Sequence, residues 1–381
     1  MKVVVVGAGL AGLRTAESLR DKGFDGEIVL LGEESHPPYD RPPLSKQVLR
    51  GEREPVFLLP EGGYAELRLD RRLGVTARGL DVAARKVLVD GGSVDYDQVV
   101  LATGATPRRL PGAPGLVLRS LDDCLALASV LQPGNRIAIV GAGLIGCEVA
   151  ASARSKGVDV HVIDVLPQPL VRVLGAEVAH RVRELHEQHG VEFHLGVGVD
   201  TASATRLELT DGTVLEVDAV LEAMGVTPTT DWLVGSGLDV TDGVACDEVG
   251  QAAEGVWAVG DMARWADGVG GSRRHEHWTR AVEQAGAVAA ALLGERQPVT
   301  DSPYWWSDQY DVKLQGVGLA APGDDVQVVD VGPKARPLAL YSRDGRLTAA
   351  VGFSAAAFVM RLRPQVLAGV AVSDVLAALR G

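Results

Sequence analysis

Apolar and polar positions follow the same pattern twice along the chain. Val3–Val6 is an uninterrupted β-branched run, which is typical of a strand buried on both faces of a sheet. A glycine-rich turn and a helical pattern through Lys22 follow, and a second strand is predicted over residues 27–31. The same order recurs between residues 137 and 163. The pattern therefore predicts two strand–turn–helix–strand units, as in proteins with parallel sheets.

Both turns carry a GxGxxG motif, and their first glycines, at positions 7 and 141, are 134 residues apart. In this motif the first glycine allows the tight turn, the second lets the backbone approach a pyrophosphate, and the third permits close packing of helix on strand. The following helix presents free N–H groups to the phosphates. One such motif is weak evidence, but two in the same context predict two dinucleotide sites. The motifs are Gly7-Ala8-Gly9-Leu10-Ala11-Gly12 and Gly141-Ala142-Gly143-Leu144-Ile145-Gly146.

An acidic residue follows the second strand of each unit: Glu33 in the first and Asp164 in the second. Such a residue accepts hydrogen bonds from ribose hydroxyls, and a carboxylate there repels the 2′-phosphate of NADP. No Lys or Arg occurs from residue 165 to residue 171, so the second site has no nearby cation for that phosphate. We therefore expect NADH to be preferred over NADPH.

Composition narrows the classes of protein. The 381 residues are 46% hydrophobic and 23% charged, as in a globular protein of about two or three domains. The net charge of −13 argues against nucleic acid and anionic membranes as partners.

The three cysteines, Cys124, Cys147 and Cys246, form neither a disulfide framework nor a CxxC metal motif, so we expect no metal site and a reducing compartment. The glycine-containing N-terminus does not resemble a signal peptide, and no segment is long and apolar enough to span a membrane. A cytoplasmic protein is expected.

Further motifs give the chain a family resemblance. They lie at residues 37–46 (PPYDRPPLSK), 101–104 (LATG), 256–261 (VWAVGD), 276–278 (EHW) and 305–310 (WWSDQY). With the two fingerprints, they resemble the FAD-dependent ferredoxin reductases that serve cytochrome P450 and aromatic-ring dioxygenase systems. The likeness thins after about residue 330.

The resemblance implies an α/β fold with two Rossmann-like dinucleotide-binding domains in a glutathione-reductase-like layout, plus a C-terminal α+β domain. An interrupted FAD-binding domain would comprise residues 1–107 and 239–296. The NAD-binding domain would comprise residues 108–238, and the C-terminal domain residues 297–381.

The resemblance also assigns cofactor-binding residues. Asp261 would accept a hydrogen bond from the FAD ribityl chain, Arg119 would bind the phosphate or adenosine region, and the backbone of Ala77 would contact adenine. Trp278 begins a helix whose N-terminus would face the flavin, although core packing also explains a tryptophan there. The implied FAD residues are Gly7, Gly9, Leu10, Ala11, Gly12, Glu33, Lys46, Ala77, Ala102, Thr103, Gly104, Arg119, Gly260, Asp261 and Trp278. The implied NAD residues are Gly141, Gly143, Leu144, Ile145, Gly146, Glu148, Asp164 and Gly225.

Three residues are implied at the reacting centre. In the family pattern Lys46 approaches flavin N5 and pairs with Glu148, and together they position the nicotinamide. Trp306 would cover the flavin edge from which electrons leave, although Trp305 and Trp306 also suit the hydrophobic floor of the C-terminal domain. Each of the two charges also suits a solvated helix surface.

The positions of the cysteines limit which group can accept electrons from the flavin. Disulfide reductases of this fold need a cysteine pair beside the flavin, and related peroxidases need one cysteine within the first fifty residues; here the first cysteine is Cys124. Cys147 is expected to be a packed, inert thiol. The resemblance therefore implies NADH-dependent reduction of FAD and single-electron transfer to a [2Fe–2S] ferredoxin. Two alternatives stay open: a rubredoxin or another small acceptor, or an NADH-responsive flavoprotein that resembles apoptosis-inducing factor.

An acidic ferredoxin would need a local basic face on this protein. The candidates for that face are Arg41, Arg264, Arg273, Arg274 and Arg280.

Overall fold

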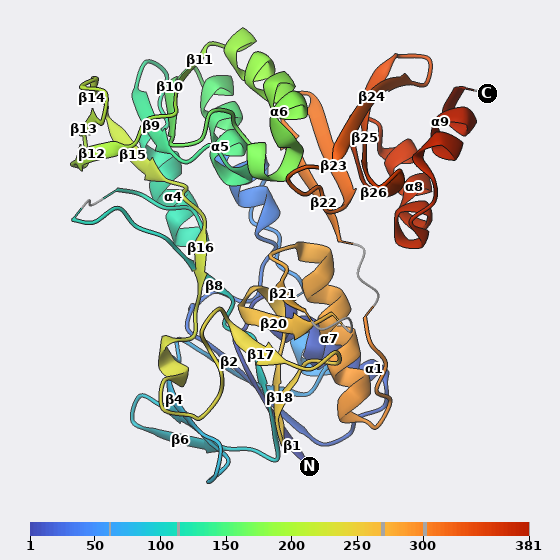
Figure 1. The fold of residues 1–381 in the computed structure, drawn as a ribbon. Coiled ribbons are helices and arrows are strands. Elements are labelled where there is room, and N and C mark those ends of the chain that lie inside the picture. Colours follow the sequence, from blue (N-terminus) through green and yellow to red (C-terminus); the bar gives the residue numbers. More distant parts are fainter. Residues whose placement is uncertain (61, 113–114, 268–270, 300–302, 381) are drawn as a thin grey trace. The chain divides into compact units, whose positions relative to one another are not determined.

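The computed structural model describes residues 1–60, 62–112, 115–267, 271–299 and 303–380, which form two compact units (Figure 1). The first unit contains the described residues of 1–40, 56–106 and 227–301. The second contains those of 41–55, 107–226 and 302–381. Two of the points where the chain passes from one unit to the other lie in the short paired strands β8 (Ala105–Pro107) and β16 (Val226–Pro228).

The first unit is built on a largely parallel sheet with the strand order β18–β19–β7–β1–β2–β3. The run Val3–Val6 is 0–2% exposed, because strand β1 lies between β2 and β7 and has other elements on both faces. Helix α1 (Leu10–Asp21) follows β1 and packs against helix α7 (Trp278–Leu292). The strands are β1 (Lys2–Val6), β2 (Glu27–Gly32), β3 (Leu69–Leu73), β7 (Gln98–Leu101), β18 (Gln251–Ala253) and β19 (Val256–Ala258).

Two smaller sheets complete the first unit. An antiparallel sheet contains β4 (Ala77–Asp81), β5 (Lys86–Val89) and β6 (Gly92–Asp95). A mixed sheet contains β17 (Val244–Cys246), β20 (Ala263–Ala266) and β21 (Ser272–Arg274). Short helical segments are α3 (Gly63–Glu66), η2 (Asp231–Leu233) and η3 (Gly260–Met262).

The second unit repeats the parallel arrangement with the strand order β11–β10–β9–β15. The strands are β9 (Arg136–Val140), β10 (Asp159–Asp164), β11 (Val191–Leu195) and β15 (Ala219–Glu222). An antiparallel sheet of β12 (Val199–Ala202), β13 (Arg206–Leu209) and β14 (Val214–Glu216) supplies leucines to the core beside β9 and β10. The helices are η1 (Pro42–Ser45), α2 (Gln47–Arg50), α4 (Leu121–Val130), α5 (Leu144–Ser155) and α6 (Val171–Gln188).

The C-terminal part of the second unit is an antiparallel sheet with the strand order β22–β23–β26–β25–β24. Helices α8 (Ala356–Ala368) and α9 (Val372–Arg380) follow this sheet. The strands are β22 (Tyr304–Gln309), β23 (Val312–Gly318), β24 (Asp325–Val331), β25 (Arg336–Arg343) and β26 (Arg346–Phe353). The expected fold class, two Rossmann-like sheets plus a C-terminal α+β segment, is confirmed. None of the described helices has the length and apolar character needed to cross a bilayer.

Candidate dinucleotide and electron-transfer site

The first glycine has the same geometry in both fingerprints. Gly7 has φ 116° and Gly141 has φ 111°, a backbone region that side chains disfavour. A Cβ on Gly7 would lie 2.1 Å from the carbonyl oxygen of Ala102, and one on Gly141 would lie 2.3 Å from that of Ala223. These two alanines directly follow β7 and β15. The first glycine is thus required by the fold itself, in both copies.

The third glycine is also required by packing. A Cβ on Gly12 would lie 1.9 Å from the carbonyl oxygen of Gly7, and one on Gly146 would lie 2.0 Å from that of Gly141. The first turns of α1 and α5 therefore contact the preceding turns too closely for any side chain at these positions.

The second glycine has no such explanation within the protein. Gly9 (φ −84°) and Gly143 (φ −80°) cap α1 and α5 in extended conformations that any residue adopts. No atom of the described residues lies within 4 Å of a Cβ built on either glycine. Neither helix has a side-chain cap, so its first N–H groups are available to an anion. Both turns thus offer the open backbone cradle that a dinucleotide pyrophosphate needs.

The first unit gathers several of the expected FAD residues around the start of α1, whereas Lys46 and Arg119 lie in the second unit. A Cβ on Gly260 (φ 74°) would lie 3.0 Å from the Cβ of Ala11, so the turn carrying Asp261 lies against the first turn of the helix. The backbone N–H of Gly260 donates to Oε1 of the buried Gln284 at 2.9 Å, which anchors this turn to α7. Ala102 lies against Gly7, as described above, and Thr103 and Gly104 continue from it.

Two further expected FAD residues lie near each other in the first unit. Glu33 is exposed just after β2, and its Oε1 accepts a hydrogen bond from the hydroxyl of Thr76 at 3.4 Å. Thr76 directly precedes Ala77, the first residue of β4. The carboxylate of Glu33 is thus free to face solvent or a ribose while it lies beside the residue expected to contact adenine.

Trp278 is the first residue of α7, as the sequence predicts. Its indole N–H donates to Oδ1 of Asp40 at 2.8 Å, and the side chain is half-buried. Burial lowers the pKa of the preceding His277, which caps the helix without a side-chain hydrogen bond.

In the second unit, Asp164 has a role that the sequence did not reveal. Its Oδ2 accepts the backbone N–H of Ala142 at 2.8 Å, and its Oδ1 accepts that of Leu166 at 2.9 Å. A carboxylate has about four lone-pair sites, so the half-buried Asp164 anchors its own fingerprint turn and still has acceptors for ribose hydroxyls. Gly225, with φ 89° and open space at its Cβ position, follows β15 by three residues.

Lys46 and Glu148 form a buried ion pair within the second unit. Lys46 Nζ lies 2.7 Å from Glu148 Oε2, and the two residues are 4% and 3% exposed. Lys46 Nζ also donates to the carbonyl oxygen of Pro42 at 3.1 Å. The hydroxyl of Ser45 donates to Glu148 Oε2, and that of Ser307 donates to Oε1 at 2.7 Å. These added hydrogen bonds offset the desolvation that makes buried charges costly.

A chain of hydrogen bonds leads to Glu148 from the end of β22. Tyr310 Oη donates to Nδ1 of His186 (3.1 Å), and Nε2–H of His186 donates to Oε1 of Gln309 (2.9 Å). The amide of Gln309 donates to Oγ of Ser307 at 3.1 Å, and Ser307 donates to Glu148. Every donor in this order points toward Glu148, so the chain of hydrogen bonds fixes the orientation of its carboxylate.

The sequence reasoning missed Ser307, Gln309 and His186. Strand alternation in β22 was the available signal, because it places Trp305, Ser307 and Gln309 on one face, where all three are buried. His186, on α6, gave no signal because only the fold brings it to Gln309.

The two adjacent tryptophans separate onto opposite faces of β22. Trp305 is buried, and its ring occupies the space beside Gly316, where a Cβ would lie 2.3 Å from the indole. Trp306 is half-buried and stacks on Tyr304 with a centroid distance of 5.9 Å. Trp305 thus belongs to the floor of the C-terminal sheet, whereas Trp306 does not.

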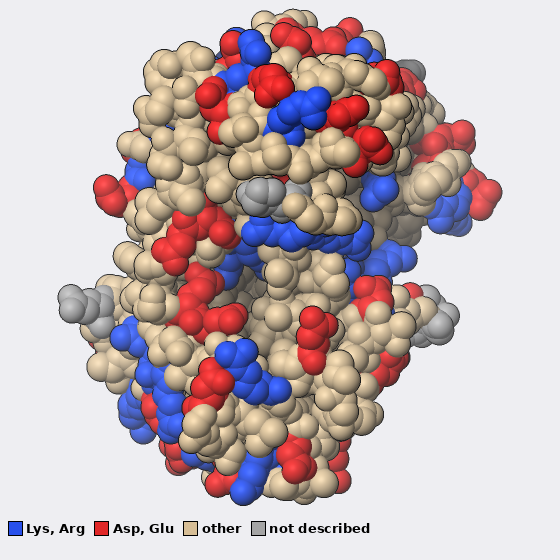
Figure 2. Space-filling view, turned by 90° about the vertical axis from the view of Figure 1, so that its left-hand side faces the viewer, with Lys and Arg blue, Asp and Glu red and all other residues tan. Residues whose placement is uncertain are grey.

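The arginines expected to dock a partner differ in exposure. Arg280 does not suit a docking surface, because its side chain is 6% exposed and its guanidinium lies 5.8 Å from the Trp265 ring centroid. Arg264 pairs with Asp239 at 2.6 Å, and Arg274 is 13% exposed between two carboxylates. Arg273 is exposed. Figure 2 shows acidic and basic side chains intermixed over one face of the molecule.

Two further expected residues, Arg119 and Arg41, lie together in the second unit, where Arg41 Nη1 donates to the carbonyl oxygen of Arg119. Arg119 precedes α4, whose capping box is formed by Ser120 and Asp123. The backbone N–H of Arg119 donates to Oδ2 of Asp123 at 3.0 Å. This cap fixes the backbone from which the Arg119 side chain projects.

The three cysteines are free and buried. Burial raises the pKa of Cys124 to about 11 and that of Cys246 to about 12, and it raises the pKa of Cys147 further still. Thiols held protonated in this way are poor nucleophiles. The side chains do not form the reactive pair that disulfide chemistry needs.

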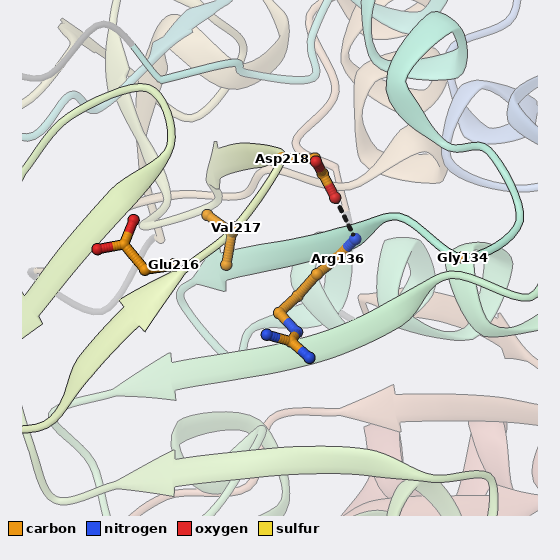
Figure 3. Close-up of a pocket in the computed structure, with 5 residues that line it drawn as sticks. All are labelled: Gly134, Arg136, Glu216, Val217 and Asp218. Carbon is orange, nitrogen blue, oxygen red and sulfur yellow. Dashed lines mark hydrogen bonds between the residues drawn. The ribbon is translucent and has the colours of Figure 1, made fainter.

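A surface pocket in the second unit lies away from the fingerprint. It is lined by Gly134, Arg136, Glu216, Val217 and Asp218, and the backbone N–H of Arg136 donates to Asp218 at 2.7 Å (Figure 3). Arg136 begins β9, whereas Gly141 follows the last residue of that strand. Since dinucleotides bind outside the carboxyl ends of parallel strands, this pocket is at the wrong end of the sheet.

Known proteins share the sequence and the fold. The family model described as pyridine nucleotide-disulphide oxidoreductase matches residues 1–285, and the reductase C-terminal model matches residues 304–378. The chain is 40% identical to the ferredoxin reductase component of chlorobenzene dioxygenase from Cupriavidus sp. (strain PS12), over 93% of this chain and 89% of that protein. It is 38% identical to rhodocoxin reductase from Rhodococcus erythropolis, over 86% and 80% of the two chains.

Among solved structures, a covalent putidaredoxin reductase–putidaredoxin complex matches with a TM-score of 0.91 at 30% identity, over 100% of this chain and 99% of that one. The C-terminal family match also spans the segment after residue 330, where the sequence motifs thin out. The open fingerprints and the matches over nearly the whole chain agree: this protein belongs to the pyridine nucleotide-disulphide oxidoreductase family and, within it, to the FAD-dependent ferredoxin–NAD⁺ reductases.

Proposed function

We propose that this protein uses NADH to reduce FAD and passes the electrons singly to a [2Fe–2S] ferredoxin that feeds a cytochrome P450 or a ring-hydroxylating dioxygenase. The observation that carries the proposal is the pair of fingerprint turns whose second glycines, Gly9 and Gly143, have open space where a side chain would be. Two cradles suit one resident dinucleotide and one exchanging dinucleotide. The relatives named as ferredoxin reductase components support the acceptor.

In this proposal the first fingerprint binds FAD and the second binds NADH. The bound flavin supplies the chemistry, because it accepts a hydride and releases single electrons. The protein supplies the phosphate cradles, the ribose acceptors Glu33 and Asp164, and Asp261 for the ribityl chain. The proposed domains are residues 1–107 and 239–296 for FAD, 108–238 for NAD, and 297–381 at the C-terminus.

Lys46 and Glu148 are proposed to position the nicotinamide. Three side-chain donors, from Ser45, Lys46 and Ser307, hold the carboxylate of Glu148, and its charge keeps the Lys46 ammonium in one place. Trp306, on the opposite face of β22 from Ser307, is proposed to cover the edge of the flavin from which electrons leave.

We propose that the ferredoxin docks on a basic patch of the first unit that includes Arg273, Arg264 and Arg274, and that Arg41 of the second unit also contacts it. Arg273 is the exposed member of this set, and the other three are half-buried. The free, buried cysteines suit a reducing compartment, and we place the reaction in the cytoplasm.

A stopped-flow experiment tests the function. The FAD-loaded protein is mixed with NADH, and the reduced protein is then mixed with purified [2Fe–2S] ferredoxin, [3Fe–4S] ferredoxin or rubredoxin, with cytochrome c as the final electron acceptor. Rapid cytochrome c reduction that depends on the [2Fe–2S] protein is expected. Equal rates with rubredoxin would contradict the acceptor assignment. A long-lived reduced-flavin complex with NAD⁺ and slow turnover would contradict the reductase assignment.

A further inference from the structure

Strands β10 and β11 bring three metal-ligating side chains together. In their parallel register His161 lies opposite Glu192, and His194 lies two residues further along β11. Side chains two residues apart in a strand lie on the same face of a sheet. The three side chains therefore share one face, at the β11 edge of the sheet in the second unit.

The distances between the ligand atoms suit one small cation. His161 Nδ1 lies 3.1 Å from His194 Nε2 and 3.5 Å from Glu192 Oε2. All three ligand atoms lie within 4.8 Å of one another. In a tetrahedral zinc site with metal–nitrogen bonds of about 2.0–2.1 Å, ligand atoms are about 3.3 Å apart. The two separations from His161 Nδ1 lie on either side of that value.

The cluster is buried on the His161 side and open to solvent on the Glu192 side. The His161 side chain is 10% exposed, whereas that of Glu192 is 71% exposed. The two imidazole nitrogens facing each other satisfy only one hydrogen bond, with one ring donating and the other accepting. A cation between them uses both lone pairs, takes Glu192 as a third ligand and leaves a fourth position for water.

We propose that His161, Glu192 and His194 bind one divalent transition metal ion of the Zn²⁺ class. Two imidazoles and a carboxylate are typical ligands for Zn²⁺, Ni²⁺ or Cu²⁺, whereas Mg²⁺ and Ca²⁺ require oxygen ligands. Sequence analysis predicts no metal site, because the cysteines form no motif and these ligands come from two strands about thirty residues apart. The site is independent of the proposed electron transfer, since none of its residues belongs to either cofactor set.

Isothermal titration with ZnCl₂ and visible absorption with CoCl₂ test the site in the tag-free, FAD-loaded protein after treatment with a chelator. One equivalent of each metal is expected to bind, and Co²⁺ is expected to give absorption typical of four-coordinate geometry. Binding of Zn²⁺ is also expected to raise the melting temperature, because the ion binds the folded state. MgCl₂ in the same titration is expected to give no saturable heat.

Single-residue variants distinguish Zn²⁺ binding at this cluster from Zn²⁺ binding at other surface histidines. His194→Ala and Glu192→Gln are expected to weaken Zn²⁺ binding by at least about tenfold, and both leave the buried His161 in place. His180→Ala is the matched control, because His180 lies 3.3 Å from Glu184 on the exposed face of α6 and no third ligand lies beside them among the described residues. The proposal is overturned if no saturable binding occurs, or if the His180→Ala and His194→Ala proteins bind Zn²⁺ equally.

Discussion

At the residue scale, a substitution of Ser307 tests whether its hydrogen bond to Glu148 matters for flavin reduction. Ser307→Ala removes the donor to Glu148 Oε1, which lies 2.7 Å from Oγ. Hydrogen bonds to charged groups contribute about 1.5–3 kcal/mol, so the limiting rate of flavin reduction by NADH is expected to fall by about tenfold or more. Stopped-flow absorbance measures this rate, and FAD is expected to stay bound.

Ser307→Thr, which keeps the hydroxyl, is expected to recover most of the rate, and Ser129→Ala is a matched control for an exposed serine. A role in stability alone would lower the melting temperature and leave the limiting reduction rate unchanged, which would refute the positioning role.

Lys46 gives the complementary residue-scale prediction. Lys46→Ala leaves Glu148 buried without its cation, and we expect flavin reduction by NADH to be slowed while FAD stays bound. The measurement is the reduction rate at saturating NADH, with the flavin spectrum as the control for cofactor content. An unchanged rate would exclude Lys46 from the hydride-transfer site.

In the proposed function Asp164 sets the preference for NADH, and a substitution at the neighbouring Val165 tests this role. Val165 is 64% exposed beside Asp164, so Val165→Arg adds a cation without disturbing the hydrogen bonds that anchor the turn. An exposed charge pair contributes about 1 kcal/mol or less, so kcat/KM for NADPH is expected to rise by up to about fivefold while that for NADH changes little. Wild-type protein with kcat/KM for NADPH equal to that for NADH would contradict the assigned preference itself.

At the element scale, replacing a fingerprint glycine by alanine is expected to affect folding differently at the third glycine and at the second. Gly12→Ala and Gly146→Ala place a Cβ within about 2 Å of backbone oxygens and are expected to prevent stable folding. Gly9→Ala and Gly143→Ala meet open space, so folding is expected to be retained while the pyrophosphate is excluded. The Gly9 variant is expected to lose FAD, and the Gly143 variant to keep FAD but show a higher KM for NADH.

Circular dichroism, flavin absorbance and steady-state kinetics distinguish the four glycine variants. A Gly143→Ala protein with the wild-type KM for NADH would mean that nothing approaches this glycine, and the second fingerprint would lose its assignment.

The contrast between local motifs and contacts made by the fold explains which features the sequence could predict. The fingerprints are local motifs whose chemistry depends on neighbours within six residues, so β1, α1, β9 and α5 could be predicted without the fold. The contact between Gly7 and Ala102, and that between His186 and Gln309, join residues about a hundred positions apart. No local pattern predicts such pairs, and the family motifs contain Ser45 and Ser307 without indicating that they hold Glu148.

His186 gives a pH prediction, because it joins α6 to β22. Burial lowers its pKa to about 4 from an ordinary value of 6.5. The unfolded chain therefore binds a proton first as the pH falls, so this histidine destabilises the folded state below pH 6.5. Between pH 7.5 and pH 5 the loss is about 2 kcal/mol.

Melting temperatures at the two pH values measure this effect. His186→Gln retains an amide donor for Gln309 and is expected to show a smaller decrease on acidification than the wild type. His189→Gln, on the exposed neighbour, is expected to behave like the wild type. Equal decreases in all three proteins would assign the acid sensitivity to other groups.

At the scale of the whole molecule, charge and burial limit what the arginines can do. Sequence reasoning cannot distinguish an exposed arginine from one packed on an aromatic ring, and Arg280 proved to be the latter. The net charge of −13 repels an acidic ferredoxin at a distance, whereas in the proposed docking Arg273 attracts it only at close range.

These opposing effects predict how electron transfer depends on ionic strength. The Debye length falls from about 30 Å at 0.01 M to about 8 Å at 0.15 M salt, so added salt first screens the long-range repulsion and then the local attraction. Ferredoxin-dependent cytochrome c reduction is therefore expected to pass through a maximum as salt is raised. Arg273→Glu is expected to raise the KM for ferredoxin and to remove the decline at high salt, while ferricyanide reduction stays unchanged. If the variant impairs both acceptors equally, Arg273 acts on the flavin or the fold, and the docking surface lies elsewhere.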